Sequence, residues 1–125
     1  MPFEWTHFIS CAEDLSKKSD EASWRSSISR AYYGAFGKIR IYCSAKYSIR
    51  TSGDSVHQKI IQILKESEDQ LEFSLGNTLS QLRDSRNEAD YDSHARITKP
   101  IVESAIKKSR DMISTLVKLN DGGQD

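Results

Sequence analysis

Hydrophobic residues recur along this chain at intervals of three and four, which is the spacing of one face of an α-helix. No segment alternates apolar and polar residues as a half-buried β-strand does. The first expected helix begins at residue 2 and ends near residues 17–20, and the second covers about 21–45. The third begins at about 56 and ends in the acidic run 66–69, and the last two cover about 75–90 and 100–119. The pattern therefore predicts an all-α fold, an antiparallel up-and-down bundle of four long helices plus one short helix.

The length of 125 residues favours one domain, with the helical bundle over 1–119 and a disordered C-terminal tail over 120–125. Ser19 or Asp20 is expected to cap the second helix. Residues 47–55 are expected to form a loop, in which Gly53 is a helix breaker and Asp54 or Ser55 caps the next helix.

Composition narrows the function classes. The formal net charge is zero, so binding to nucleic acid would require a local basic patch. The sequence shows no signal-peptide pattern and no apolar run near the ~18 residues of a membrane span. Cys11 and Cys43 lie in apolar segments and are expected to be buried free thiols, as in a reducing cytoplasm. Without paired metal-ligand motifs, we expect no metal and no cofactor.

Arg86 interrupts the apolar stripe of the fourth helix. At ~100° per residue it lies about 20° from Leu75, in the middle of the stripe. An unpaired buried guanidinium is very costly, and Asp90, one turn later, can reach it. Two interpretations follow: a buried Arg–Asp pair that fixes the helix register, or a cationic centre for an anionic ligand.

Residues 25–50 contain six basic side chains and no acidic one, interleaved with tyrosines. This mixture suits single-stranded nucleic acid, although most of the basic residues are expected to be solvated surface. Arg30, Tyr33, Gly37 and Arg40 share a face opposite the core. The glycine predicts close approach by another helix, either from the same chain or from a second copy. His57 is expected to be a capping or packing residue in a first helical turn.

Three motifs, SRAYYGAF (29–36), SVHQ (55–58) and LRDSRNEADYD (82–92), resemble the HEPN superfamily, the "higher eukaryotes and prokaryotes nucleotide-binding" proteins. The similarity is greatest to small stand-alone prokaryotic members and spans nearly the whole chain. It implies an antiparallel helical bundle that often dimerises, with two Arg–polar…His motifs facing one another across a cleft. Many members are metal-independent ribonucleases that serve as toxins or in antiviral defence. Others are inactive partners, or companions of small nucleotidyltransferases.

Carried onto this sequence, the resemblance matches Arg86 to the motif arginine and Asn87 to the polar position. The motif histidine follows after four to six intervening residues, whereas His94 follows Arg86 after seven, and Tyr91 after four. On a continuous helix His94 would lie ~12 Å from Arg86 along the axis. The two can meet only if the helix breaks near Tyr91, or if His94 reaches Arg86 of a second copy. The candidate catalytic residues are Arg86, Asn87 and His94, and the candidate substrate-binding residues are Arg30, Tyr33, Asp90 and Tyr91.

Two hypotheses stay open at the level of sequence. In the first, a cytoplasmic homodimer engages RNA or a nucleotide phosphate at an Arg86-centred cleft between helices. The resemblance then implies a metal-independent ribonuclease in a toxin–antitoxin or phage-defence system. In the second, the bundle is a non-catalytic interaction module that pairs with itself or with a nucleotidyltransferase-like partner. There the Arg86–Asp90 pair is structural.

Overall fold

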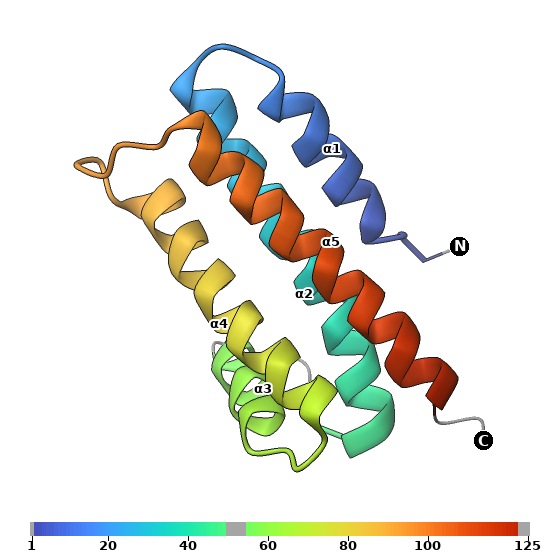
Figure 1. Cartoon of the computed structure of the whole chain (residues 1–125). Coiled ribbons are helices and arrows are strands. Elements are labelled where there is room, and N and C mark those ends of the chain that lie inside the picture. The colour runs from blue at the N-terminus through green and yellow to red at the C-terminus, as the bar shows by residue number, and fades with distance from the viewer. Residues whose placement is uncertain (1, 50–54, 123–125) are drawn as a thin grey trace.

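The computed structural model describes residues 2–49 and 55–122, and over these residues it contains five helices and no strand. The helices are α1 (Thr6–Ser16), α2 (Glu21–Tyr47), α3 (Val56–Lys65), α4 (Gln70–Tyr91) and α5 (Lys99–Gly122). Figure 1 shows α1, α2, α4 and α5 running alternately up and down, with α3 beside the lower half of α4. The predicted all-α bundle is confirmed.

The core forms where the apolar stripes of α2, α3, α4 and α5 meet. The stripes predicted for the third and fourth helices are buried in full, including Arg86. In α2 the predicted stripe is buried from Ile28 to Ile39, while Trp24 and Tyr42 at its ends are partly buried. Helical periodicity therefore predicted correctly which faces of these helices meet.

The helix boundaries follow local capping chemistry. Asp20, one of the two predicted caps, accepts a hydrogen bond from the Ser23 backbone N–H at the start of α2. Asp69 caps α4 in the same way. Ser55 occupies the position before α3, but its side chain makes no capping hydrogen bond. The predicted roles of Gly53 and Asp54 lie outside the described residues.

Three predictions about the chain ends and the cysteines differ from the structure. The first helix begins at Thr6 and not at Pro2. The last helix continues through residues 120–122, beyond Leu119, while 123–125 lie outside the described residues. Cys43 is buried as predicted, but Cys11 is exposed, because α1 turns Ile9 and Ala12 inward.

Helix α1 lies close against α2 at two glycines. A Cβ atom added at Gly34 would lie 2.6 Å from the Ile9 side chain, and one added at Gly37 would lie 2.3 Å from the Trp5 ring. Another helix therefore does approach the glycine face of α2, as predicted. It is α1 of the same chain, so this face is not left free for a second copy.

Replacing Gly37 with alanine is expected to lower the free energy of unfolding by about 1–2 kcal/mol. Alanine gains ~1 kcal/mol in helix propensity, but the clash with Trp5 forces a repacking that costs more. Urea denaturation followed by tryptophan fluorescence measures the difference. Gly122→Ala is the control, because no atom lies within 4 Å of the added Cβ there. Unchanged or higher stability of Gly37→Ala would contradict the close α1–α2 contact.

A buried carboxylate joins the C-terminal end of α2 to the start of α4. Glu72 is 0% exposed and accepts hydrogen bonds from the hydroxyls of Tyr42, Tyr47 and Ser67 and from Lys46 Nζ, which lies 2.8 Å away. Burial alone would raise the pKa of Glu72, but the four donors outweigh it and hold the pKa at about 2. Glu72 is therefore an ionised, fully partnered charge inside the bundle.

Candidate functional site

Arg86 lies on α4 with only 6% of its surface exposed. Its guanidinium carbon is 5.1 Å from the ring centroid of Tyr32, 5.3 Å from that of Tyr33 and 5.8 Å from that of Tyr91. These distances are typical of cation–π contacts. The sequence-based expectation that Arg86 occupies a leucine-like position is therefore confirmed, and three tyrosine rings surround it.

The predicted partner Asp90 gives Arg86 only weak compensation. Asp90 Oδ2 lies 4.0 Å from Arg86 Nη1, beyond hydrogen-bond distance, and it accepts a hydrogen bond of 3.2 Å from the Ser29 hydroxyl. The Asp90 side chain is 26% exposed. The Nε atom of Arg86 is buried without a hydrogen-bond partner among the described residues.

Arg83, one helical turn before Arg86, also has a buried Nε without a partner in the described part of the chain. Arg83, Arg86, Tyr32, Tyr33 and His57 form what we call the Arg86 cluster. In this cluster the Arg86 guanidinium lies against two tyrosines of α2, and the charge of Arg83 acts on Tyr32 and on His57 in the first turn of α3. Neither Arg83 nor His57 was among the residues proposed from sequence for the site.

His57 stacks on Phe36 with 4.1 Å between ring centroids, and its Nδ1 lies 2.6 Å from the Tyr32 hydroxyl. It is thus a packing residue, as expected. Tyr32 and Tyr33 each contact both the His57 ring and the Arg86 guanidinium. Burial, reinforced by the charges of Arg83 and Arg86, lowers the pKa of His57 to about 4. The imidazole is therefore neutral at pH 7.

The hydrogen bond to Tyr32 limits what the imidazole can do. Burial raises the pKa of the Tyr32 phenol, so Tyr32 keeps its proton and can donate it to His57 Nδ1. A neutral imidazole that accepts at Nδ1 carries its proton on Nε2. Nε2 makes no hydrogen bond to any residue the structure describes. In this tautomer it is a donor, which suits contact with an oxyanion.

His94 and Asn87, the other candidate catalytic residues, are exposed. Helix α4 ends at Tyr91, as convergence of His94 on Arg86 would require. The structure nevertheless does not bring them together: within the described chain the His94 ring makes no hydrogen bond and no ring contact with the cluster. Tyr91 is 76% exposed, with one face near Arg86.

Arg25 fixes the segment that carries His94, a role that the sequence analysis missed. Its guanidinium donates hydrogen bonds to the backbone carbonyls of Glu88, Ala89, Asp92 and Ala95. These carbonyls include unpaired acceptors at the C-terminal end of α4. Arg25 was expected to be solvated surface, but its side chain is only 19% exposed, because it caps α4.

Arg30 and Tyr33 connect the Arg86 cluster to α1. The Arg30 guanidinium carbon lies 4.5 Å from the Phe8 ring centroid and 5.6 Å from that of Tyr33. Arg30 thus stacks between an α1 aromatic ring and Tyr33, and Tyr33 in turn contacts Arg86. Of the four residues proposed for substrate binding, three lie against Arg86 and Arg30 lies behind Tyr33.

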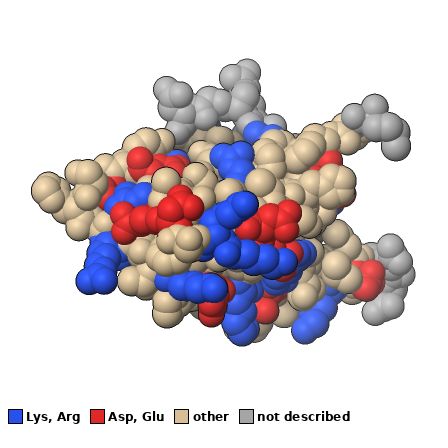
Figure 2. All heavy atoms as spheres, turned by 90° about the horizontal axis from the view of Figure 1, so that it is seen from above, with Lys and Arg blue, Asp and Glu red and all other residues tan. Residues whose placement is uncertain are grey.

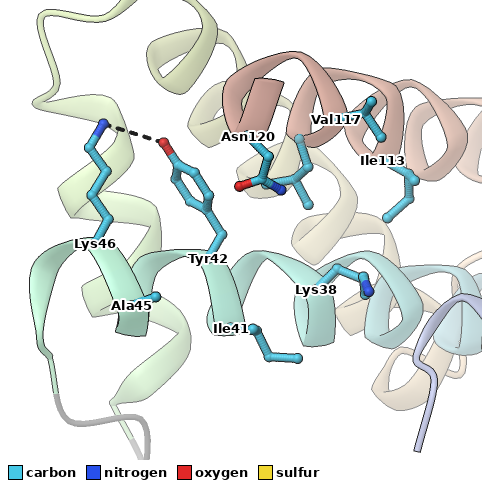
Figure 3. A pocket seen from close by; sticks show the side chains of 9 residues that line it. Lys38, Ile41, Tyr42, Ala45, Lys46, Ile113, Val117 and Asn120 are labelled. Atoms are coloured by element: carbon cyan, nitrogen blue, oxygen red, sulfur yellow. Dashed lines mark hydrogen bonds between the residues drawn. The ribbon is translucent and has the colours of Figure 1, made fainter. Parts of the chain in front are cut away.

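The surface around the Arg86 cluster adds no broad patch of positive charge on the face shown in Figure 2. On the face shown in Figure 2, basic and acidic side chains are interspersed and neither sign gathers into a broad patch. Positive potential would therefore come from the local pair of arginines. A hollow of about 500 Å³ lies away from the cluster, between α2 and α5 (Figure 3).

Over residues 2–49 and 55–122, none of the helices is both long and apolar enough to span a bilayer. No family model, curated protein or solved structure matches this chain. The similarity to the HEPN superfamily therefore rests on the three motifs quoted above and stays a prediction.

Proposed function

We propose that this protein binds RNA or nucleotide phosphate at the Arg86 cluster, as a HEPN-type homodimer. The observation that carries the proposal is the pair of buried Nε atoms on Arg83 and Arg86. The setting implied by the resemblance, toxin–antitoxin or phage defence, is part of the same proposal.

Two adjacent guanidinium groups with unpaired donors favour an anionic acceptor. A buried donor that loses its bonds to water and gains no acceptor costs about 1–3 kcal/mol, and more when it is charged. Asp90 Oδ2 lies 4.0 Å from Arg86 Nη1, beyond hydrogen-bond distance, and neither Nε atom has a hydrogen-bond partner among the described residues. A phosphate group offers several oxygens and matches the planar fork of an arginine. The cluster is therefore better suited to phosphate than to a single carboxylate.

The tyrosines supply the second part of RNA recognition. Tyr91 is exposed beside Arg86, so a base can stack on its free face while the arginines hold the phosphate. His57 Nε2–H adds a neutral donor next to Tyr32 and Tyr33. These contacts support single-stranded RNA over duplex, because stacking requires unpaired bases.

Cleavage of RNA without metal needs a base at the 2′-hydroxyl, an acid at the leaving oxygen and a cation for the phosphorane charge. Arg86 supplies the cation. His57 is the imidazole within the cluster, and it acts as a base only in the opposite tautomer, with Nδ1–H donating to Tyr32. The geometry thus supports phosphate binding directly and ribonuclease activity only after a tautomer change.

Titrating purified protein into labelled single-stranded RNA in EDTA tests the proposal. Arg83→Gln is expected to weaken binding at least ~10-fold and to lower the salt slope by about one, because one phosphate contact is lost. His57→Gln is expected to weaken it several-fold, and His94→Gln to leave it unchanged. Fluorescence anisotropy gives the affinities, and a gel of the same samples scores cleavage.

Lys107→Gln is the matched control, because Lys107 is a basic residue on α5 whose side chain is 77% exposed. Absence of binding by the unsubstituted protein, or equal losses in Arg83→Gln and Lys107→Gln, would rule out the phosphate site. A loss confined to His94→Gln would move the site to the 92–98 loop. Cleavage that disappears only with His57→Gln would indicate a ribonuclease whose catalytic imidazole is His57 of α3.

The 6% exposure of Arg86 inside a ring of tyrosines favours one second candidate, a non-catalytic interaction module in which Arg86 braces α2 against α4. In that case Arg86 contributes to the stability of the bundle, which pairs with itself or with a nucleotidyltransferase-like partner.

A further inference from the structure

A basic and apolar groove lies between α2 and α5, at the end of the bundle away from the α4–α5 loop. It has a volume of about 500 Å³. Figure 3 shows its lining side chains: Lys38, Ile41, Tyr42, Ala45 and Lys46 from α2, and Ile113, Val117 and Asn120 from α5. Leu116 of α5 completes the lining. Ile41 and Val117 are 55% and 54% exposed. We call this surface the basic groove.

The basic groove continues along α2 into a second hollow, which shares Ile41 and Ala45 and adds Arg40. Three basic residues border the two hollows, and no acidic residue is among those that line them. Lys38 is paired with Glu4 and Lys46 with Glu72, so Arg40 is the rim residue whose positive charge has no ion-pair partner among the described residues. Contiguous exposed apolar surface with a polar rim is typical of protein-binding sites. The apolar lining, with the positive charge of Arg40 at its rim, indicates an apolar occupant that carries negative charge.

The same chain carries such a surface at the α3–α4 turn. Residues 66–73 expose Glu66, Glu68 and Asp69, together with Leu71 at 38% and Phe73 at 43% exposure. We call this segment the acidic turn. It has what the groove lacks, negative charge beside large exposed apolar side chains, and so the two surfaces are complementary.

The basic groove and the acidic turn are neighbours on one molecule. Lys46, on the groove wall, forms an ion pair of 2.8 Å with Glu72, which lies between the exposed Leu71 and Phe73. Two adjacent complementary surfaces become self-complementary under a two-fold axis, because each groove then receives the other copy's turn. A formal net charge of zero means that two copies do not repel one another as a whole.

We propose that the basic groove of one copy receives the acidic turn of a second copy, and that this double contact is the homodimer interface. The inference rests on the homodimer of the proposed function and gives it a location. It differs from the arrangement that the resemblance implies, in which residues 82–96 of two copies face one another. The interface leaves Tyr91 in solvent, so each copy keeps its own Arg86 cluster accessible.

Sedimentation velocity with surface variants tests the interface. Ile41→Glu places a like charge in the groove opposite the acidic turn, and Phe73→Lys does the same in the turn opposite the groove. Each is expected to raise the dimer dissociation constant at least ~10-fold. Both side chains are exposed, so circular dichroism should show unchanged helix content.

A mixture of the two variants carries the sharpest prediction. Each mixed pair contains one unmodified groove and one unmodified turn, so mixing should restore part of the association that each variant alone has lost. Ile101→Glu is the control, because Ile101 is a 40% exposed apolar residue on α5 outside the groove. It should remain dimeric.

The outcomes separate this inference from the proposed function. If Tyr91→Glu abolishes the dimer while Ile41→Glu and Phe73→Lys do not, the interface lies at residues 82–96 and the inference is wrong. A protein that stays monomeric at every concentration overturns the inference and the homodimer, yet RNA titration can still support the phosphate site. Loss of RNA binding with an unchanged dimer response overturns only the proposed function.

Discussion

Replacing Arg86 with methionine is expected to reduce RNA affinity by ~100-fold, about 3 kcal/mol, while the free energy of unfolding stays equal or rises by about 1 kcal/mol. Methionine fills a similar elongated space without charge. In the unsubstituted protein the Nε of the buried guanidinium is unpaired, and the one carboxylate that pairs with it among the described residues, Asp90, lies 4.0 Å from Nη1. Removing the guanidinium therefore costs little stability in the protein without RNA. Replacing a buried charge of this kind by an apolar side chain often stabilises the folded protein.

The expected loss of RNA affinity comes from a contact that Arg86 makes only with bound phosphate. A phosphate held beside Arg83 and Arg86 would lose a charged bidentate contact and would leave Arg83 as the only cation contacting it. Arg86→Lys keeps the charge but lacks the planar fork, so it should recover only part of the affinity. Urea denaturation and RNA anisotropy measured on the same samples give both quantities.

The brace interpretation predicts the opposite pattern. If Arg86 holds α2 against α4 through the tyrosine rings, Arg86→Met should lose those cation–π contacts. It would then unfold at lower urea concentration, and any RNA binding would persist in the folded fraction. Destabilisation by several kcal/mol with unchanged RNA affinity would therefore replace the phosphate site with the non-catalytic module.

Helix periodicity was enough to predict the bundle and the burial of Arg86. The repeat of three and four residues assigns each side chain a direction on its own helix, and Arg86 shares the direction of Leu75 and Leu79. The same reasoning failed at the start of α1: the expected helix began at residue 2 and so included Trp5, which instead precedes the helix. There the deciding contact is with a glycine of α2, which carries no hydrophobic signal.

The composition of the Arg86 cluster depends on how the helices come together. Spacing along α4 related Arg86 to Asp90 but said nothing of His57, which reaches the cluster from α3. The sequence did offer one further member of the cluster, Arg83, which lies three residues before Arg86 and thus on nearly the same face of α4. Arg25 gave no local signal, because the carbonyls it caps lie more than sixty residues later in the chain.

Glu72→Leu is expected to lower the free energy of unfolding at pH 7 by about 2–3 kcal/mol, because the part-buried hydroxyls of Tyr42, Tyr47 and Ser67 lose their charged acceptor. Four donors converge on this fully buried carboxylate, and an apolar side chain leaves Lys46 and three hydroxyls without their acceptor. The same network, with burial as the larger cause, raises the pKa of Tyr42 to about 12. Urea denaturation at pH 7 measures the loss, and Ser74→Leu, at an exposed position of α4, is the control.

The pH dependence of the free energy of unfolding tests whether the ionised carboxylate of Glu72 causes this stabilisation. The pKa of Glu72 is about 2 in the folded protein against an ordinary value of 4.5. Between these values the unfolded chain binds a proton that the folded protein excludes, so the stability from Glu72 is full above pH ~4.5 and is lost as pH falls toward 2. The difference in stability between the unsubstituted protein and Glu72→Gln should therefore narrow across this window. His57, with a folded pKa of about 4 against 6.5, also destabilises the protein in acid, but at higher pH, and it does so equally in both proteins. A gap that stays constant from pH 5 to pH 2.5 would show that Glu72 contributes packing and neutral hydrogen bonds instead of an ionised carboxylate.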